Sequence, residues 1–193
     1  MNKPTLAIPT PPALRAVSST CLTAAGWLRG SFHVPDKQGF GDYLQHSGAF
    51  LPMTDVTVPG ETSPRPFFAL QRDDIRIAVP DSGDANIETL PAGGFTSPWS
   101  VACLLPEGVL EGQIDFLTNQ RLSDHLRVSR GYVVVREAGW EPLLERPSPL
   151  GSGDRWPVAL VNIQRLVGIA EASTQRGYGH PGRYTTPTDY EVG

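Results

Sequence analysis

Apolar and polar residues alternate along two separate segments of the chain. In residues 27 to 34 the apolar side chains of Leu28, Phe32 and Val34 are separated by polar or small neighbours, and residues 109 to 116 follow the same rule. A period of two places the apolar side chains on one face of an extended chain. The pattern therefore predicts two half-buried strands, one in each half of the sequence.

A different spacing follows each of these segments. Phe40 and Leu44 lie four residues apart, which is the spacing of neighbours on one face of a helix. Leu122 and Leu126 repeat that spacing later in the chain. Short helices of about two turns are therefore predicted within residues 39 to 47 and, in the second half, from residue 121 to residue 129.

Further apolar stretches follow the first of these helices. Residues 50 to 58 predict one strand, and residues 66 to 79 predict a pair of strands that separate around residues 71 to 74. The chain also contains 20 glycines and 19 prolines among its 193 residues, which disfavours long helices and favours turn-rich β structure. We therefore expect a mainly β protein.

The two halves of the sequence are related to each other. Residues 17 to 56 align without a gap on residues 99 to 138, an offset of 82, with ten identical positions out of forty. Average residue usage gives roughly two or three identities by chance. Beyond residue 65 the offset grows to 91, so the second copy carries nine additional residues in one loop. Two copies are too few for a solenoid, so a tandem pair of small domains is predicted.

The duplication divides the chain into five parts. Two repeats are separated by a linker rich in glycine and proline, and an extended arm is expected at each end. The predicted parts are an N-terminal arm at 1 to 16, the first repeat at 17 to 80, the linker at 81 to 98, the second repeat at 99 to 170 and a C-terminal tail at 171 to 193.

Gly30 and Gly112 recur on the inward face of the two alternating strands, where a missing side chain allows a sharp bend or a close crossing. A glycine-punctuated strand, a short helix and a β-rich run resemble the Sm-like and SH3-like barrels of uncharacterised bacterial families. The resemblance covers both repeats and implies two tandem strand-helix-strand-strand-strand barrels with extended terminal arms. It implies RNA binding or oligomeric rings in some families and scaffolding in others.

The charge of the chain argues against a nucleic-acid partner. The net charge is -4, and no stretch beyond the N-terminal arm carries a basic excess, whereas nucleic-acid binders concentrate lysine and arginine on one face. The two cysteines, Cys21 and Cys103, are too few for a disulfide framework and fit a reducing compartment. The first residues lack the apolar run of a signal peptide, and a cytoplasmic protein without a transmembrane segment is expected.

Residues typical of catalysis do not form a recognisable motif. None of the four histidines recurs in the other repeat, and His33 is expected on the outer face of its strand in solvent. The repeated pair Asp42 and Asp124 is interpreted as acidic groups in an early helical turn, where a carboxylate caps free N–H groups. Cys21 and Cys103 are interpreted as core residues. No catalytic residue, metal ligand or cofactor is predicted.

The nine additional residues of the second copy lie in a loop between positions 139 and 155 that is unexpectedly apolar. Loops lie at the surface, so such side chains either fold back on the protein or contact a partner. The tail contributes three tyrosines to the same hypothesis. The candidate partner-binding residues are Trp140, Leu143, Leu144, Leu150, Tyr178, Tyr184 and Tyr190.

These observations favour a non-enzymatic accessory or scaffold subunit that docks on other protein subunits of a larger assembly. The cytoplasmic side of a membrane complex is one such place. The alternative is an RNA-binding or ligand-binding Sm-like module, and an enzyme is the third interpretation. A salt-dependent shift with RNA would favour the alternative, whereas a stable stoichiometric protein complex would favour the first.

Overall fold

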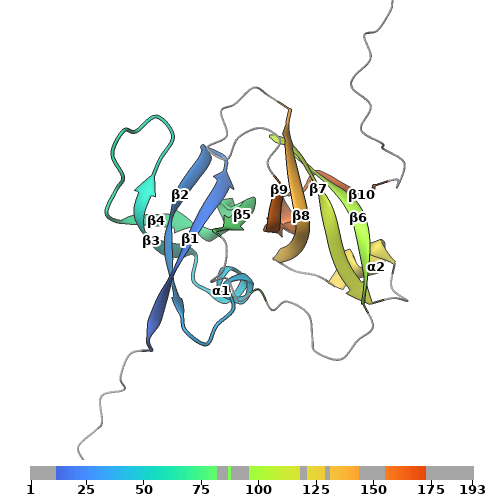
Figure 1. Ribbon diagram of the computed structural model, residues 1–193, viewed down its shortest axis with the longest axis horizontal. Coiled ribbons are helices and arrows are strands. Elements are labelled where there is room, and N and C mark those ends of the chain that lie inside the picture. The colour runs from blue at the N-terminus through green and yellow to red at the C-terminus, as the bar shows by residue number, and fades with distance from the viewer. Residues whose placement is uncertain are drawn as a thin grey trace, which may run out of the picture.

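The protein is mainly β, with ten antiparallel strands in a single sheet and only short helical segments (Figure 1). The computed structural model describes residues 12 to 81, 87, 96 to 117, 121 to 128, 131 to 143 and 155 to 172. In chain order the elements are β1 (Leu14–Thr23), β2 (Gly26–Pro35), α1 (Phe40–His46), β3 (Phe50–Thr57), β4 (Phe68–Gln71), the 3-10 turn η1 (Arg72–Asp74), β5 (Ile77–Pro80), β6 (Thr96–Leu105), β7 (Gly108–Leu117), α2 (Leu122–Val128), β8 (Tyr132–Pro142), β9 (Arg155–Asn162), η2 (Ile163–Arg165) and β10 (Gly168–Glu171).

The order of elements occurs twice along the chain. Each half reads strand, strand, helix, strand, strand, 3-10 turn, strand. The predicted short helices are confirmed as α1 and α2, and the predicted division of residues 66 to 79 is confirmed by η1. β1 and β6 begin at Leu14 and Thr96, three residues before the predicted repeat boundaries of 17 and 99.

The ten strands follow the order β10-β6-β7-β8-β9-β5-β1-β2-β3-β4. Within each half, the first strand pairs with the last, β1 with β5 and β6 with β10. The halves meet where β5 pairs with β9, with Ile77 opposite Val161 and Ala78 opposite Leu160. One hydrogen-bonded sheet therefore runs through both halves, a connection that the sequence did not predict, and β4 and β10 form its two ends.

Two hydrophobic clusters fill the interior, one for each half. The predicted core residues of the first repeat are all buried in one cluster; they are Leu28, Phe32, Val34 and Leu44. In the second cluster Leu110 and Ile114 are buried and Leu126 packs against them, while the side chain of Phe116 lies outside the described part. Each half also contributes side chains to the cluster of the other half: Trp27 of the first half lies in the second cluster, and Tyr132 of the second half lies in the first.

Gly30 lies beside a break in the register between β2 and β3. Arg29 pairs with Thr57 whereas Ser31 pairs with Thr54, so β3 carries one extra residue at this point, as in a β-bulge. A Cβ atom on Gly30 would lie 3.0 Å from the carbonyl oxygen of Thr54. Glycine fits at this position, where a larger residue would not, because the backbone of β3 approaches it closely. This close approach agrees with the prediction that Gly30 lies on the inward face of its strand.

The same break occurs in the second half at Gly112. Glu111 pairs with Gly139 and Gln113 pairs with Arg136, so β8 also carries one extra residue. A Cβ atom on Gly112 would lie 2.6 Å from the carbonyl oxygen of Arg136. The repeated glycines therefore mark a repeated bulge, and the duplication extends to backbone detail.

One residue of each bulge has a backbone conformation that costs energy. Asp55 and Glu137 have φ angles of 54° and 49°, in the left-handed region that favours glycine. We expect Asp55→Gly and Glu137→Gly each to raise the free energy of unfolding by about 0.5 to 1 kcal/mol, measured by urea titration. Alanine at the same positions should give no such gain, and loss of stability in the glycine variants would contradict the assigned strain.

Candidate functional site

Trp140 lies in the core rather than in a surface loop. It belongs to β8, is 6% exposed and meets Trp27 edge to face, with ring centroids 5.9 Å apart. Trp156 also meets Trp27 edge to face, with ring centroids 5.8 Å apart. Because Trp27 comes from the first half, this tryptophan cluster holds the two halves together. Trp140 therefore acts as a core residue of this chain and is not an exposed partner contact.

The other predicted partner-binding residues divide into two groups. Leu143 directly follows β8 and is 59% exposed, so it remains accessible. The rest lie outside the described residues; they are Leu144, Leu150, Tyr178, Tyr184 and Tyr190.

The repeated cysteines are core residues, as the sequence indicated. Cys21 and Cys103 are free thiols, one in each hydrophobic cluster. Burial raises the pKa of each thiol to about 12. Both therefore stay protonated near neutral pH, and a protonated thiol is a poor nucleophile.

The polar residues singled out in the first repeat have structural contacts. Asp42 lies in the first turn of α1, where its Oδ2 accepts a hydrogen bond from Nε2 of Gln38 at 2.8 Å and its Oδ1 lies 2.7 Å from Nδ1 of His46. Its carboxylate thus contacts side chains, one before the helix and one in its last turn, rather than the free N–H groups that we expected it to cap. His33, which we expected in solvent, is half-buried with Nε2 3.2 Å from the hydroxyl of Thr54.

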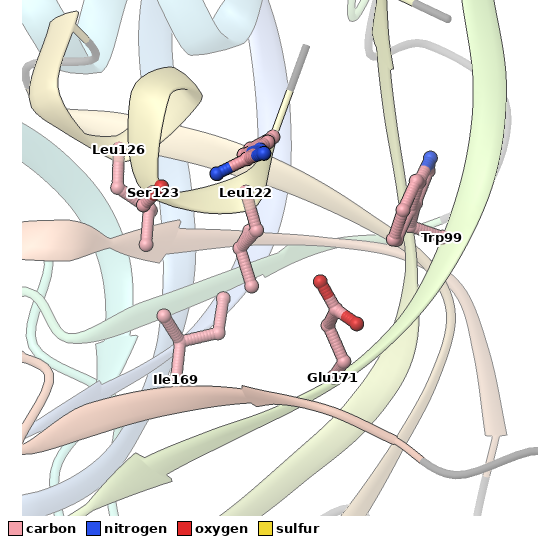
Figure 2. A pocket seen from close by; sticks show the side chains of 7 residues that line it. Trp99, Leu122, Ser123, Leu126, Ile169 and Glu171 are labelled. Carbon is pink, nitrogen blue, oxygen red and sulfur yellow. The ribbon is translucent and has the colours of Figure 1, made fainter. Parts of the chain in front are cut away.

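A groove of about 490 Å³ opens between α2, β6 and β10 in the second half, and we call it the α2–β10 groove. Figure 2 shows Leu122 and Leu126 on the helix side, Ile169 and Glu171 on β10 opposite, and Trp99 beside them. Its lining residues are Trp99, Arg121, Leu122, Ser123, Leu126, Ile169 and Glu171. The site is thus mainly apolar and flanked by one cation and one anion.

The backbone beside this groove is the end of the sheet. β10 is the terminal strand, and in the described part of the chain it pairs with β6 alone. A terminal strand has N–H and C=O groups along its outer edge that can pair with another extended chain. The α2–β10 groove therefore combines an apolar depression with backbone hydrogen-bonding groups, the two requirements for binding an extended polypeptide.

The first half has a position equivalent to the α2–β10 groove, but there the position is filled by other side chains. We call residues 82 or 91 positions apart repeat counterparts, according to the alignment. Leu126 and Ile169 of the groove are half-buried, whereas their counterparts Leu44 and Ala78 are completely buried. The difference arises because β8 and β9 of the second half cover the first-half position.

Two side chains of the second half fill the first-half position. Tyr132 of β8 and Leu160 of β9 belong to the hydrophobic cluster that contains Leu44 and Ala78. The phenolic hydroxyl of Tyr132 donates a hydrogen bond to the carbonyl oxygen of Arg72 at 3.0 Å. Burial raises the pKa of this hydroxyl, so it remains a protonated donor.

Polar contacts fix the same junction. Nδ2 of Asn162 donates to the carbonyl oxygen of Ile75 at 3.1 Å, and the backbone N–H of Asn162 donates to Arg76 at 2.9 Å. Arg76 also forms an ion pair with Glu107, in the turn between β6 and β7. The junction between halves therefore consists of the β5–β9 strand pair and the ring of Tyr132 packed against the first half. Hydrogen bonds to backbone carbonyls and the Arg76–Glu107 ion pair add to it.

The sequence did not reveal this groove, since its residues come from three segments that are far apart along the chain. One signal was present. Leu51 and Met53 face the core of the first half, so Phe50 lies on the opposite face of β3. A large aromatic side chain on the exposed face of a strand is typical of a binding surface. Its repeat counterpart is Tyr132, the residue that fills the first-half position.

Comparison with known proteins adds no family to this description. No protein-family model, curated protein or solved structure matches the chain. Across the described ranges, no three histidine, cysteine, aspartate or glutamate side chains gather as metal ligands. None of the helices in the described part of the chain has the length and apolar character needed to span a bilayer.

Proposed function

We propose that the protein is a non-enzymatic scaffold subunit that binds an extended protein segment in the α2–β10 groove. The segment would add a strand to β10 and place an aromatic or large aliphatic side chain between α2 and β10. The observation that carries this proposal is the first-half counterpart of the groove, in which β9 pairs with β5 and Tyr132 enters the cluster beside α1.

The architecture we propose is a tandem pair of small barrels of the Sm-like or SH3-like kind. Three features support it: each half has the same order of elements, each half pairs its first strand with its last, and each carries the same bulge beside a glycine. Pairing of first and last strands bends a five-stranded sheet around its own core. The barrels would serve as rigid supports for the binding groove.

The chemistry of the groove favours protein over nucleic acid. Arg121 and Glu171 flank it with opposite charges, so it has no excess of positive charge to attract phosphates. The site we propose is in the cytoplasm, on a larger protein assembly, because the free, buried cysteines Cys21 and Cys103 fit a reducing compartment.

Site-specific photo-crosslinking in the cells that produce the protein tests this function. A benzophenone amino acid in place of Leu126 should give covalent adducts with a polypeptide, whereas the same group at the exposed Lys37 should not. Ile169→Glu, combined with the probe at position 126, should abolish the adducts because a carboxylate would have to be desolvated in an apolar groove. Equal adduct formation at positions 126 and 37 would contradict the proposed binding site.

A further inference from the structure

The end of the sheet opposite the groove has a matching apolar surface. Phe50 of β3 is 62% exposed, and Phe67, directly before β4, is 63% exposed. β4 is the terminal strand at this end and pairs with β3 alone in the described part of the chain. The two ends lie on opposite sides of the molecule in Figure 1, so β4 of one chain cannot reach the groove of the same chain without unfolding.

The repeat alignment identifies what this exposed surface corresponds to. Phe50 is the counterpart of Tyr132, and Ala69 of β4 is the counterpart of Leu160. Tyr132 and Leu160 are buried against the first half, whereas Phe50 and Ala69 are exposed. The first half therefore carries an unused copy of the surface by which the second half binds the first.

We infer that the α2–β10 groove binds the β4 end of a second copy of this chain, so that the junction between halves is repeated between molecules. This inference rests on the proposed function and names its partner. Within the chain, Ala78 lies opposite Leu160 and Ile77 lies opposite Val161. The counterpart register places Ile169 of one molecule opposite Ala69 of the next, antiparallel, with Phe50 entering the groove beside Leu126.

The charged groups at the junction are compatible with this repetition. Arg76 and Glu107 form an ion pair within the chain, and their counterparts are Val167 and Ala25, both exposed. At the junction between molecules, apolar residues would thus stand at both positions that the ion pair occupies within the chain. The interface between molecules would therefore contain no unpaired charge at these positions. Val167 is 66% exposed in the single chain, which such an interface would cover.

A junction that joins the β10 end of one molecule to the β4 end of the next is heterologous. Each molecule retains one free end of each kind after the first contact, so association continues beyond a dimer unless the chain of molecules closes on itself. Backbone pairing would also cover the outer edges of β4 and β10, which no other described strand pairs with, and so protect them from nonspecific pairing.

Disulfide trapping between two variants of the 193-residue chain tests the register. Mixed Ala69→Cys and Ile169→Cys proteins should form a disulfide-linked dimer under mild oxidation, because directly opposed residues of an antiparallel pair have Cβ atoms close enough for a disulfide. Mixing Ala69→Cys with Leu117→Cys is the matched control, since Leu117 is exposed but belongs to β7, which pairs with β6 and β8 and with neither terminal strand. Cys21 and Cys103 are buried and should contribute little background.

A yield in the first mixture at least roughly ten times that of the control, removed by Phe50→Ser in the Ala69→Cys protein, is the expected result. Ala69→Cys should keep the unfolding midpoint of the wild type because Ala69 is exposed, whereas Ile169→Cys should lower the midpoint slightly because the smaller side chain packs less well against the second hydrophobic cluster. Equal yields in the two mixtures would overturn the inference. Photo-crosslinks from position 126 to a different protein, with no trapped dimer, would overturn it while leaving the proposed function standing.

Discussion

Replacing Trp27 with alanine is expected to lower the free energy of unfolding by about 3 to 5 kcal/mol, the usual range for removing a large buried aromatic side chain. Trp27 is buried and packs edge to face against Trp140 and Trp156 at centroid distances of 5.9 and 5.8 Å. It lies in the first half but belongs to the hydrophobic cluster of the second. The change should therefore destabilise both halves together, measured as a single shifted transition in urea.

Leu14→Ala is the matched control for this change. Leu14 is a large apolar residue of the same half, but it is exposed, so its truncation should cost no more than about 0.5 kcal/mol. Two separate transitions in Trp27→Ala, one at the wild-type midpoint, would show that the halves fold independently and would contradict the shared sheet and core.

Gly112→Ala is expected to cost about 3 kcal/mol, because the added methyl group has no space. Its Cβ atom would overlap Cγ1 of Val135 and lie 2.6 Å from the carbonyl oxygen of Arg136. The carbonyl belongs to the bulged backbone of β8 and cannot move without breaking the strand pairing. Thermal unfolding should show a correspondingly lower midpoint.

Gly139→Ala, in the same strand pair, provides the comparison. Among the described residues, a Cβ atom there would meet only Cγ of Arg155, at 4.0 Å, so the change should be close to neutral. An equal loss of stability at positions 112 and 139 would mean that alanine destabilises β7 and β8 at any glycine position. The close approach of the backbone at the bulge would then not be the cause of the loss at Gly112.

Local patterns predicted much of this fold because they depend on neighbouring residues. The spacing of Phe40 and Leu44 predicted α1, and the polar residues 71 to 74 correctly separated β4 from β5. β1 was not predicted as a strand. Its residues from Ser19 to Thr23 are all buried, so both faces are covered and the alternation that marks a half-buried strand is lost.

Long-range pairing limited the prediction of the site. The contact of β5 with β9 joins residues such as Ala78 and Leu160 that lie in different repeats, and no local pattern encodes it. Of the two alternatives for the apolar loop, Trp140 takes the first and folds back on the protein, because β8 extends to Pro142, further than the first-half strand β3 does relative to the alignment. The outward aromatic Phe50 was visible in the sequence, but its meaning depends on where Tyr132 lies.

The molar mass of the 193-residue chain in solution distinguishes a junction that serves both within and between molecules from one that is confined to a single molecule. Light scattering from roughly 1 to 100 µM covers the affinities expected of a small interface. The wild type should rise with concentration above the 20.9 kDa of one chain, while Ile169→Glu should remain at that mass. A wild-type mass of 20.9 kDa over the whole range would show that the β4 end does not bind the α2–β10 groove of a second molecule.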